Sequence, residues 1–338
     1  MTGAAAMGRD LLLVTGGAGF IGSNIARAAA EDGYRVVVAD WLETGPKWRN
    51  IADIPLHDVI RPEAINAFVE REGGRLAGIV HMGAISATTE RDGDKIVTHN
   101  IRATLDLWDL CTRKGLPFIY ASSAATYGDG SEGFTDDESL PGLGLLAPLN
   151  PYGWSKLFVD RRIMADVESG AAHPPQFAGL RFFNVYGPGE DHKGDMRSVV
   201  HKIYPAAEAG EKVTLFKSHH PDYGDGGQLR DFIHVSDCVE VVRWLLENPS
   251  VSGIFNVGTG KARSFADLAT AVFTALGQEP RIHYVDMPAH LQKAYQYFTE
   301  ADVTKLRAAG YKRPFMSLEE GVAAYVSEHL KATGGVVS

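Results

Sequence analysis

The sequence lacks the features that mark several specialised classes of protein. It has only two cysteines among 338 residues, so we expect neither a disulfide framework nor a cysteine-bound metal. No apolar run approaches the roughly 20 residues of a membrane-spanning helix. The first ten residues also lack the basic and apolar segments of a secretory signal. These absences predict a soluble protein of the cytoplasm with no membrane partner.

The chain also lacks an excess of positive charge. Its 42 acidic and 33 basic residues give a formal net charge of −9 at pH 7. Such a chain is not expected to bind nucleic acid or an anionic membrane surface. A negatively charged small substrate would need local basic groups, so individual lysines and arginines are the candidates to contact it.

Short apolar runs alternate with helical patterns through the first part of the chain. Apolar runs without polar alternation are typical of parallel strands buried on both faces. They occur at residues 11–17, 35–40, 78–83, 117–123 and 177–185. Segments with helical spacing of apolar residues lie between them. The alternation predicts the α/β class, with a doubly wound parallel sheet of Rossmann type.

The alternation weakens after about residue 184, where loops rich in glycine, proline and histidine appear. We therefore expect a smaller α/β substrate-binding domain that is interleaved with the sheet domain. The predicted dinucleotide-binding domain comprises residues 1–183 and 227–260, and the predicted substrate-binding domain comprises residues 184–226 and 261–335.

The segment TGGAGFIG lies between a predicted strand and a predicted helix. Gly16 allows a tight turn, Gly19 lets the backbone approach a pyrophosphate, and Gly22 lets the helix pack close to the sheet. Phe20 and Ile21 begin the helix, whose free N–H groups and partial positive charge suit a phosphate. Since an acidic residue ends the next strand, the pattern favours a dinucleotide site over a purely structural turn.

The acidic residue at the end of the second strand is Asp40. Its carboxylate would accept hydrogen bonds from the adenosine ribose, which favours NAD. Lys47 and Arg49 follow closely and would neutralise the 2′-phosphate of NADP. We expect NADP, with NAD as the open alternative. Asp58, after the next apolar stretch, is predicted either to bond adenine or to lie in solvent.

The segment YGWSK places Tyr152 and Lys156 four residues apart, on one face of a predicted helix. An ammonium beside a phenol favours the tyrosinate, so Lys156 is expected to lower the pKa of Tyr152 and to hold the nicotinamide ribose. Ser123, at the end of a predicted strand, would bond the same substrate oxygen as Tyr152. Ligands of such sheets bind at the carboxyl ends of strands, where Ser123 and the glycine loop both lie.

The chain resembles the extended short-chain dehydrogenase/reductase family over almost its whole length. The resemblance rests on six motifs in the family's order: TGGAGFIG, SSAATYG, YGWSK, RFFNVYGP, RDFIHVSD and GIFNVGTG. It implies that Gly83 and Ala84 line the cofactor and that Asn100 lies behind the active site. It also implies a homo-oligomer.

The same resemblance implies two contacts with a nucleotide-sugar substrate. Asn184 would lie near that substrate, and Arg230 would meet one of its phosphates. The residues themselves leave another role open for Arg230, because an ion pair with Asp231 or Asp237 would also satisfy its charge.

One branch of this family removes water from hexoses with an Asp-Glu pair that follows the active-site hydroxyl residue. This chain has two alanines there, and methyl groups transfer no protons, so dehydration is not expected. Three stretches instead resemble the branch that epimerises ADP-glycero-manno-heptose at C6 for lipopolysaccharide biosynthesis: GAISATTERDGDKI, YGPGEDHKGDMRSVV and AYQYFTEADVTKLRAAGYKRPF. That resemblance implies substrate contacts by Ser86, Thr88 and Tyr295, although a tyrosine in such a segment is more often a core residue.

Three departures from that branch stand out. Gly189 replaces a residue that is commonly Arg, Ala294 stands where a basic residue is expected, and an added loop covers residues 218–228. The loop contains residues that suggest a metal site but lack a further partner at helical spacing. A hydrated loop without a metal is therefore predicted for His219, His220 and Asp222.

Epimerisation at C6 requires a keto group that turns over while the cofactor stays on one side. Its oxygen then faces another part of the pocket, so two acid/base groups on opposite sides are expected. Tyr152 is the first, and the resemblance gives Lys193 as the second. Burial would bring the Lys193 pKa toward neutrality. The residues alone leave Lys193 solvated in the polar loop EDHKGDM, with His192 contacting substrate or shaping the loop.

Two other functions stay open at this point. A UDP-hexose 4-epimerase would oxidise a ring carbon, and the turning ring would let one tyrosine serve both faces. A non-catalytic dinucleotide-sensing protein would not need Ser123, Tyr152 and Lys156 together, and this chain has all three. The favoured prediction is an isomerase, namely a nucleotide-sugar epimerase that uses bound NAD(P).

Overall fold

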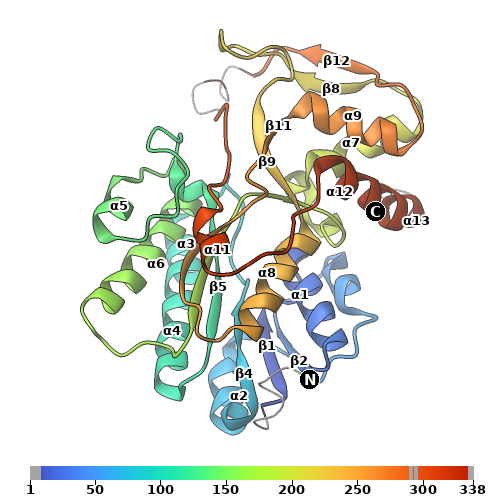
Figure 1. The fold of residues 1–338 in the computed structure, drawn as a ribbon. Coiled ribbons are helices and arrows are strands. Elements are labelled where there is room, and N and C mark those ends of the chain that lie inside the picture. The colour runs from blue at the N-terminus through green and yellow to red at the C-terminus, as the bar shows by residue number, and fades with distance from the viewer. Residues whose placement is uncertain (1–8, 289–291, 293–295, 334–338) are drawn as a thin grey trace.

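The structure is a computed structural model that describes residues 9–288, 292 and 296–333. Its largest element is a seven-stranded sheet in which every neighbouring pair is parallel (Figure 1). In spatial order, the strands are β10 (Gly253–Val257), β6 (Phe177–Phe182), β5 (Phe118–Ser123), β4 (Leu76–His81), β1 (Leu11–Thr15), β2 (Arg35–Ala39) and β3 (Asp58–Ile60). This order confirms the predicted doubly wound sheet of Rossmann type.

Buried apolar residues form the central strands. All five residues of β1, LLLVT, are buried, as are the last four of β2. Leucine and valine suit strands that are covered on both faces, where polar alternation has no role. The side chains of β1 divide between two cores, since Leu12 and Val14 join one and Leu11 and Leu13 join the other.

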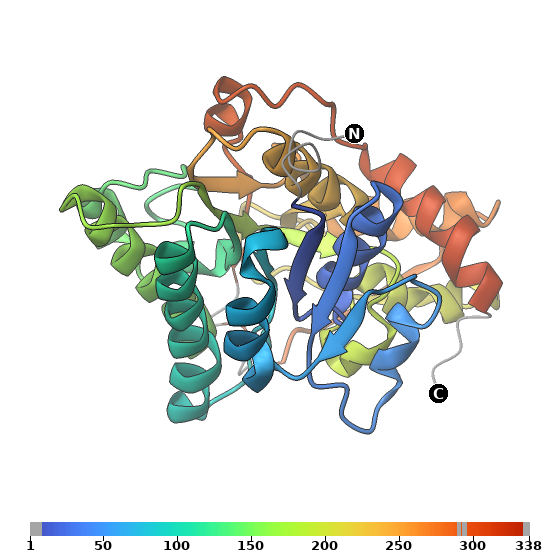
Figure 2. The same ribbon diagram turned by 90° about the horizontal axis from the view of Figure 1, so that it is seen from below.

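Helices cover both faces of the main sheet, as the view from below shows (Figure 2). On one face, α1 (Phe20–Glu31) packs against α8 (Val235–Glu247). The other face is covered by α2 (Ile65–Glu72), α4 (Ala103–Lys114) and α6 (Pro151–Glu168). Shorter segments are η2 (Pro46–Ile51), η3 (Pro62–Ala64), η4 (Gly73–Arg75), α3 (Gly93–Ile96), the π-helix η5 (Val97–Arg102), η6 (Ala124–Tyr127), α5 (Leu140–Leu145) and α11 (Thr304–Ala308).

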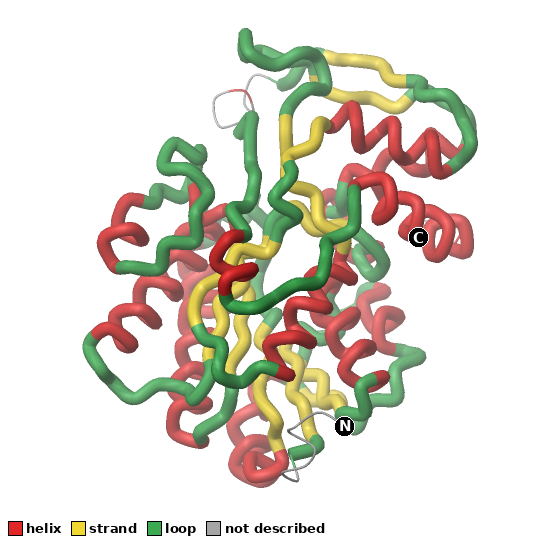
Figure 3. The backbone as a smooth tube through the Cα atoms, viewed as in Figure 1, coloured by secondary structure: helices red, strands yellow, loops and turns green. Residues whose placement is uncertain are grey.

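A second group of strands and helices lies above the main sheet in the view of Figure 3. Its three-stranded sheet contains β11 (Ala262–Ser264), β9 (Leu229–His234) and β7 (Asn184–Tyr186), and its two-stranded sheet contains β12 (Ile282–Val285) and β8 (Val213–Phe216). The helical segments are η7 (Asp191–Met196), α7 (Val199–Glu208), α9 (Phe265–Ala275), α12 (Leu318–Tyr325), the π-helix η8 (Val326–Leu330) and α13 (Lys331–Thr333). Helices α7, α9 and α12 share one apolar core.

Strand β9 connects the two groups. The sequence pattern places residues 230–248 with the main sheet, but β9 pairs with β7 and β11. Its alternating side chains explain its position, because Phe232 joins the core of the second group and Ile233 joins the core beneath α1 and α8. The domain boundaries stay a prediction. No helix within the described part of the chain is long and apolar enough to cross a membrane.

Candidate active site

The glycine loop joins β1 to α1 and packs tightly against the loop after β4. Gly16 has φ of +61°, and a Cβ atom there would lie 2.6 Å from the Cα of Gly83. A Cβ atom on Gly22 would lie 2.2 Å from the carbonyl oxygen of Gly16. Both positions therefore require glycine, as the dinucleotide fingerprint predicts.

The amino end of α1 has no side-chain cap. Gly19 is the N-cap and supplies no side-chain hydrogen bond to the first turn, where no acidic residue lies. Phe20 is buried, and Ile21 is partly buried against the core. The first N–H groups of this twelve-residue helix are thus oriented to receive an anion, together with the helix dipole.

Asp40 directly follows β2 beside this loop and is 6% exposed. One carboxylate oxygen accepts the Ala18 N–H at 2.9 Å, and the other lies 2.6 Å from the Lys47 ammonium. A cavity of about 440 Å³ opens at this point, and its lining includes Asp40, Trp41 and Arg61. Asp58 is exposed at the start of β3.

Ser123, Tyr152 and Lys156 meet at the carboxyl end of β5. Ser123 is the last residue of β5 and accepts the Ala125 N–H at 3.1 Å. Asn150 caps α6, which turns Tyr152 and Lys156 toward this strand. The Lys156 ammonium donates to the Ala121 carbonyl at 2.7 Å. The structure therefore brings together the three residues that the sequence placed in one site.

Burial has the largest effect on the pKa values of Tyr152 and Lys156. It raises the pKa of the Tyr152 phenol, and the Ser123 hydroxyl opposes part of that change. It lowers the pKa of Lys156 to about 8, while the Asp160 carboxylate opposes the change. The Lys156 ammonium lies 6.0 Å from the centre of the Tyr152 ring. The predicted lowering of the Tyr152 pKa is therefore wrong, because burial outweighs the hydrogen bond from Ser123 that opposes it.

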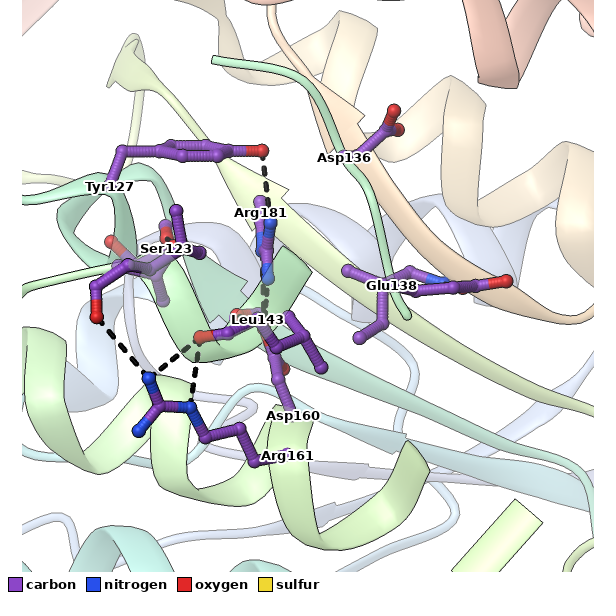
Figure 4. Close-up of polar contacts among 12 residues, drawn as sticks. Ser123, Tyr127, Asp136, Glu138, Leu143, Asp160, Arg161 and Arg181 are labelled. Carbon is purple, nitrogen blue, oxygen red and sulfur yellow. Dashed lines mark hydrogen bonds and ion pairs between the residues drawn. The ribbon is translucent and has the colours of Figure 1, made fainter. Parts of the chain in front are cut away.

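A buried ion pair between Asp160 and Arg181, which sequence reasoning missed, lies close to this group (Figure 4). Asp160 lies one helical turn after Lys156, and both it and Arg181 are 0% exposed. The Asp160 carboxylate accepts from Tyr120, Ser122 and Arg181 at 3.0, 2.9 and 3.1 Å. Asp160 thus bonds the side chains of Tyr120 and Ser122 on β5. The carbonyl of Ala121, between them, accepts the hydrogen bond from Lys156. The spacing of Asp160 after Lys156 was the available signal.

Asn100 lies behind the site, where the family resemblance places it. It is fully buried in the π-helix η5 and exchanges two hydrogen bonds with Ile85, at 2.8 and 3.0 Å. It also donates to the Ser155 hydroxyl at 3.1 Å, and Ser155 bonds the Tyr152 carbonyl at 2.7 Å. Asn100 thereby joins the loop after β4, which contains Gly83 and Ala84, to α6.

The polar loop EDHKGDM forms the short helix η7, and Lys193 is half-buried in it. The Lys193 ammonium lies 5.2 Å from the centre of the Phe20 ring at the start of α1. Burial lowers the pKa of Lys193, and the buried Glu190 carboxylate opposes the change. Lys193 therefore lies against the start of α1 and is not extended into solvent, and its proton-transfer role stays a prediction.

Two asparagines that sequence reasoning missed hold this loop against α1. Asn24 donates to the Pro188 carbonyl at 2.8 Å, and Asn50 donates to the carbonyls of Gly189 and Ala18 at 3.0 Å. Asn50 also lies 3.2 Å from the ring of His192. Because these partners are far apart in sequence, no spacing rule pointed to them.

Gly189 explains one departure from the resembled branch. Its φ is +95°, and a Cβ atom there would lie 3.3 Å from side-chain atoms of Ser23 and Asn24. A glycine in this position lets the loop approach α1 closely, so the departure is accommodated by local packing.

Arg230 lies 8% exposed at the start of β9. It donates to the Leu229 carbonyl at 2.8 Å and to the Gln296 carbonyl, and its guanidinium lies 5.8 Å from the centre of the Phe265 ring. The Asp231 carboxylate is occupied by backbone N–H groups of residues 259, 260 and 301. A phosphate role for Arg230 stays a prediction.

The other predicted substrate residues lie on exposed segments or outside the described residues. Ser86 and Thr88 are exposed after β4, and Asn184 is exposed at the start of β7. Tyr295 and Ala294 lie outside the described residues.

The added loop at residues 218–228 packs on the segment after β12. The ring Nε2 of His219 accepts the Met287 N–H at 3.3 Å, and the backbone N–H of His219 donates to the Tyr297 hydroxyl at 3.0 Å. The rings of His220, Tyr223 and Tyr297 cluster with centroids 5.1 to 5.3 Å apart. The loop thus contains an aromatic cluster, and His219, His220 and Asp222 are exposed in it.

The model of the NAD dependent epimerase/dehydratase family matches residues 12–258. The chain belongs to this family. The family assignment agrees with the sheet order, the glycine loop and the Ser123, Tyr152 and Lys156 group described above.

Curated relatives in the epimerase/dehydratase family cover nearly the whole chain. An ADP-L-glycero-D-manno-heptose-6-epimerase of Nitratidesulfovibrio vulgaris is 50% identical over 95% of this chain and 98% of its own. The protein of the same name from Fusobacterium nucleatum is 43% identical over the same shares.

Solved structures in the same family agree with the fold. The ADP-L-glycero-D-manno-heptose-6-epimerase of Helicobacter pylori is 28% identical, with a TM-score of 0.77 over 96% of this chain and 97% of that one. A Thermus thermophilus UDP-glucose 4-epimerase in complex with NAD is 27% identical, with a TM-score of 0.73 over 95% and 99%.

Proposed function

We propose that this protein epimerises ADP-glycero-manno-heptose at C6, by transient oxidation and re-reduction of that carbon. Two kinds of support converge on this reaction. Relatives of up to 50% identity over 95% of the chain have the name of this epimerase. The observation that carries the proposal is the position of the Lys193 ammonium, 5.2 Å from the centre of the Phe20 ring, where it would serve as the second proton-transfer group.

A nicotinamide dinucleotide fits the residues at the carboxyl ends of β1 and β2. Gly16 and Gly22 leave no room for side chains, and the uncapped amino end of α1 suits a pyrophosphate. Bound there, the cofactor would take hydride from C6 and return it to the same carbon. Lys156 would hold the nicotinamide ribose, and Gly83 and Ala84 would line the site.

Tyr152 and Lys193 would divide the proton transfers. Tyr152 projects from α6 beside Ser123, whereas Lys193 projects from η7 beside Phe20. Ser123 would orient the C6 oxygen while Tyr152 exchanges its proton. After the keto group turns over, Lys193 would exchange the proton on the other side. The lowered pKa of Lys193 suits this role, because the neutral amine must be accessible near operating pH.

Further residues would bind the ADP-heptose. Arg230 would contact the diphosphate, and its position at the start of β9 brings a buried guanidinium to the second group of elements. We propose additional contacts from Ser86, Thr88, Asn184, His192 and Tyr295. A homo-oligomer in the cytoplasm is part of the same proposal.

The preferred cofactor would be NADP, with NAD as a weaker ligand. The Lys47 ammonium lies 2.6 Å from the Asp40 carboxylate and neutralises it, so a 2′-phosphate would not face an unpaired negative charge. Titration of the protein with each cofactor tests this preference. Lys47→Ala is expected to weaken NADP about tenfold while changing NAD by less than about twofold. Tighter binding of NAD than of NADP by the unchanged protein would contradict the preference.

Incubation of the purified protein with each ADP-heptose epimer tests the main proposal. Nuclear magnetic resonance of the C6 proton should show each epimer converting to the same mixture, without net consumption of cofactor. The absence of conversion from either epimer, in protein that holds the cofactor, would disprove it.

A UDP-hexose 4-epimerase is the second candidate, because solved 4-epimerases resemble the chain nearly as closely in fold. In that reaction the sugar ring turns as a whole, so one tyrosine suffices and Lys193 has no role. Conversion of a UDP-hexose at C4, unaffected by Lys193→Ala, would favour this candidate. A non-catalytic sensing protein would convert neither substrate.

A further inference from the structure

Two histidines from separate elements bond the carboxylate of Asp191, which opens η7 two residues before Lys193. His201, on α7, lies 2.9 Å from one carboxylate oxygen, and His329, on η8, lies 3.2 Å from the other. His201 is 2% exposed, and the side chain of His329 is 23% exposed. The hydrogen bonds from His201 and His329 hold the pKa of the Asp191 carboxyl below its usual range.

The backbone of η7 connects this cluster to Lys193. The Lys193 N–H donates to the Glu190 carbonyl at 3.0 Å, which closes the turn around Asp191. The Glu190 side chain is 1% exposed and accepts the Ser198 hydroxyl at 2.6 Å. Ser198 in turn caps α7. Movement of Asp191 would therefore displace Lys193, because both belong to one closed turn.

Of the two contacts with Asp191, the one from His329 is the more informative. Its segment, η8, is far from η7 in sequence and is not a regular α-helix. His329 lies in a π-helical segment, a rare conformation that is frequent at functional sites. Its ring stacks on Tyr325, with centroids 5.7 Å apart and planes at 27°. The red segment at the end of the described chain (Figure 1) is thereby joined to the loop that bears Lys193.

We propose that Asp191, His201 and His329 form a positioning cluster through which the C-terminal helical segment fixes Lys193 in the site. The cluster does not touch the reacting atoms and acts through the η7 turn. This inference rests on the proposed function, since it assigns a structural cause to the placement of the second proton-transfer group.

Comparison of the two epimers separates positioning from general stability. In the proposed reaction, oxidation of one epimer requires Tyr152 to accept the hydroxyl proton, and oxidation of the other requires Lys193. A defect in the positioning of Lys193 therefore slows one oxidation and spares the other. A general loss of stability would slow both alike.

The experiment measures cofactor reduction by stopped-flow absorbance, with each ADP-heptose epimer, in two variants at one position. His329→Phe keeps the stacking on Tyr325 and removes the N–H group. His329→Gln keeps an N–H donor. The matched control is His173→Phe, because His173 also stacks on an aromatic ring, that of Trp108, and lies in the segment that leads to the amino end of β6.

We expect His329→Phe to slow the oxidation of one epimer about tenfold and to change the other by less than about twofold. His329→Gln should restore most of the lost rate, and His173→Phe should change neither. Equal slowing of both epimers, or no change in either, overturns the positioning cluster.

Hydrogen exchange provides a second readout that needs no substrate. Amides of residues 190–197 should exchange faster in His329→Phe than in the unchanged protein and in His173→Phe, because the turn loses one anchor. Unchanged exchange there overturns the inference even if activity falls. If the unchanged protein converts neither epimer, the proposed function fails instead, and the exchange measurement still decides whether η8 fixes the turn.

Discussion

The two proposed proton-transfer groups, Tyr152 and Lys193, lie on a long regular helix and on a short irregular turn, respectively. Tyr152 projects from α6, an eighteen-residue helix that packs on the main sheet, and Lys156 bonds the backbone of β5 directly. Lys193 projects from a six-residue segment with a kink at Gly194, where φ is +53°. Regular secondary structure thus places the first group, whereas side-chain hydrogen bonds from α1, η2, α7 and η8 place the second.

This contrast has an energetic consequence. A side chain on a packed helix keeps its position through many backbone hydrogen bonds and apolar contacts, so the loss of one contact changes little. A short turn depends on a few polar contacts, each of which contributes about 1 kcal/mol. Variants near Lys193 should therefore affect the reaction more than stability. The buried ion pair behind Tyr152 is an exception among the contacts of the packed helix, because loss of the Asp160 carboxylate leaves the Arg181 charge unpaired and should affect both.

Removal of the Tyr152 hydroxyl is expected to have the largest effect on activity. Tyr152→Phe should slow interconversion of the ADP-heptoses by about 10³- to 10⁴-fold, since it removes a general acid and base. The melting temperature should change little, because the ring stays in place. Phe158→Tyr, on the same helix with an exposed side chain, is the control and should retain activity.

Lys193→Ala is expected to cost about 10²- to 10³-fold in interconversion, and to do so unequally for the oxidation of the two epimers. Lys202→Ala, at an exposed lysine on α7, is the control and should behave as the unchanged protein. Near-normal interconversion by Lys193→Ala would remove the second proton-transfer group from the mechanism.

Asp160→Asn tests the region behind Tyr152. Arg181 would keep its charge in a fully buried position without its partner, so the free energy of unfolding should fall by about 3 kcal/mol, measured by urea denaturation.

The same variant has a predicted pH dependence. Lys156 has a pKa of about 8 and is charged below it, so activity that depends on this charge falls as the pH rises through that value. Asp160 raises the Lys156 pKa, so the fall should begin at lower pH in Asp160→Asn. Tyr127→Phe removes one hydrogen bond to Arg181 but no charge, and it should leave the pH profile unchanged. A profile that does not move would exclude the tuning role of Asp160.

Asn50→Ala should have the smallest effect and the most local one. It removes the hydrogen bonds to Ala18 and Gly189, so the Lys193 loop would detach in part from η2 and the glycine loop. We expect interconversion to fall about threefold to tenfold, with a loss of about 1 kcal/mol in the free energy of unfolding. Loss of stability with unchanged activity would show that the tether does not affect Lys193.

The sequence predicted the features that depend on local spacing. The glycine loop, the Tyr152 and Lys156 pair and the parallel strands follow from patterns within a few residues, and the structure contains all of them. The lowering of the Tyr152 pKa was predicted from spacing and was wrong, because burial depends on the whole fold.

The polar contacts around Lys193 were beyond prediction for a related reason. Asn50 reaches Gly189 across 139 positions, and His329 reaches Asp191 across 138. Hydrogen bonds between such distant residues have no periodicity, so only the folded chain reveals them. The family resemblance indicated that Lys193 matters, but it did not indicate what holds that residue.

The hydrogen bond between His329 and Asp191 also has a consequence for biosynthesis. A ribosome releases residues in order, so Lys193 leaves it long before His329 does. The glycine loop, β5 and α6 have all been synthesised by then, but the last anchor of the η7 turn has not. The group around Tyr152 would therefore be synthesised well before the contact that the proposed cluster gives to the η7 turn.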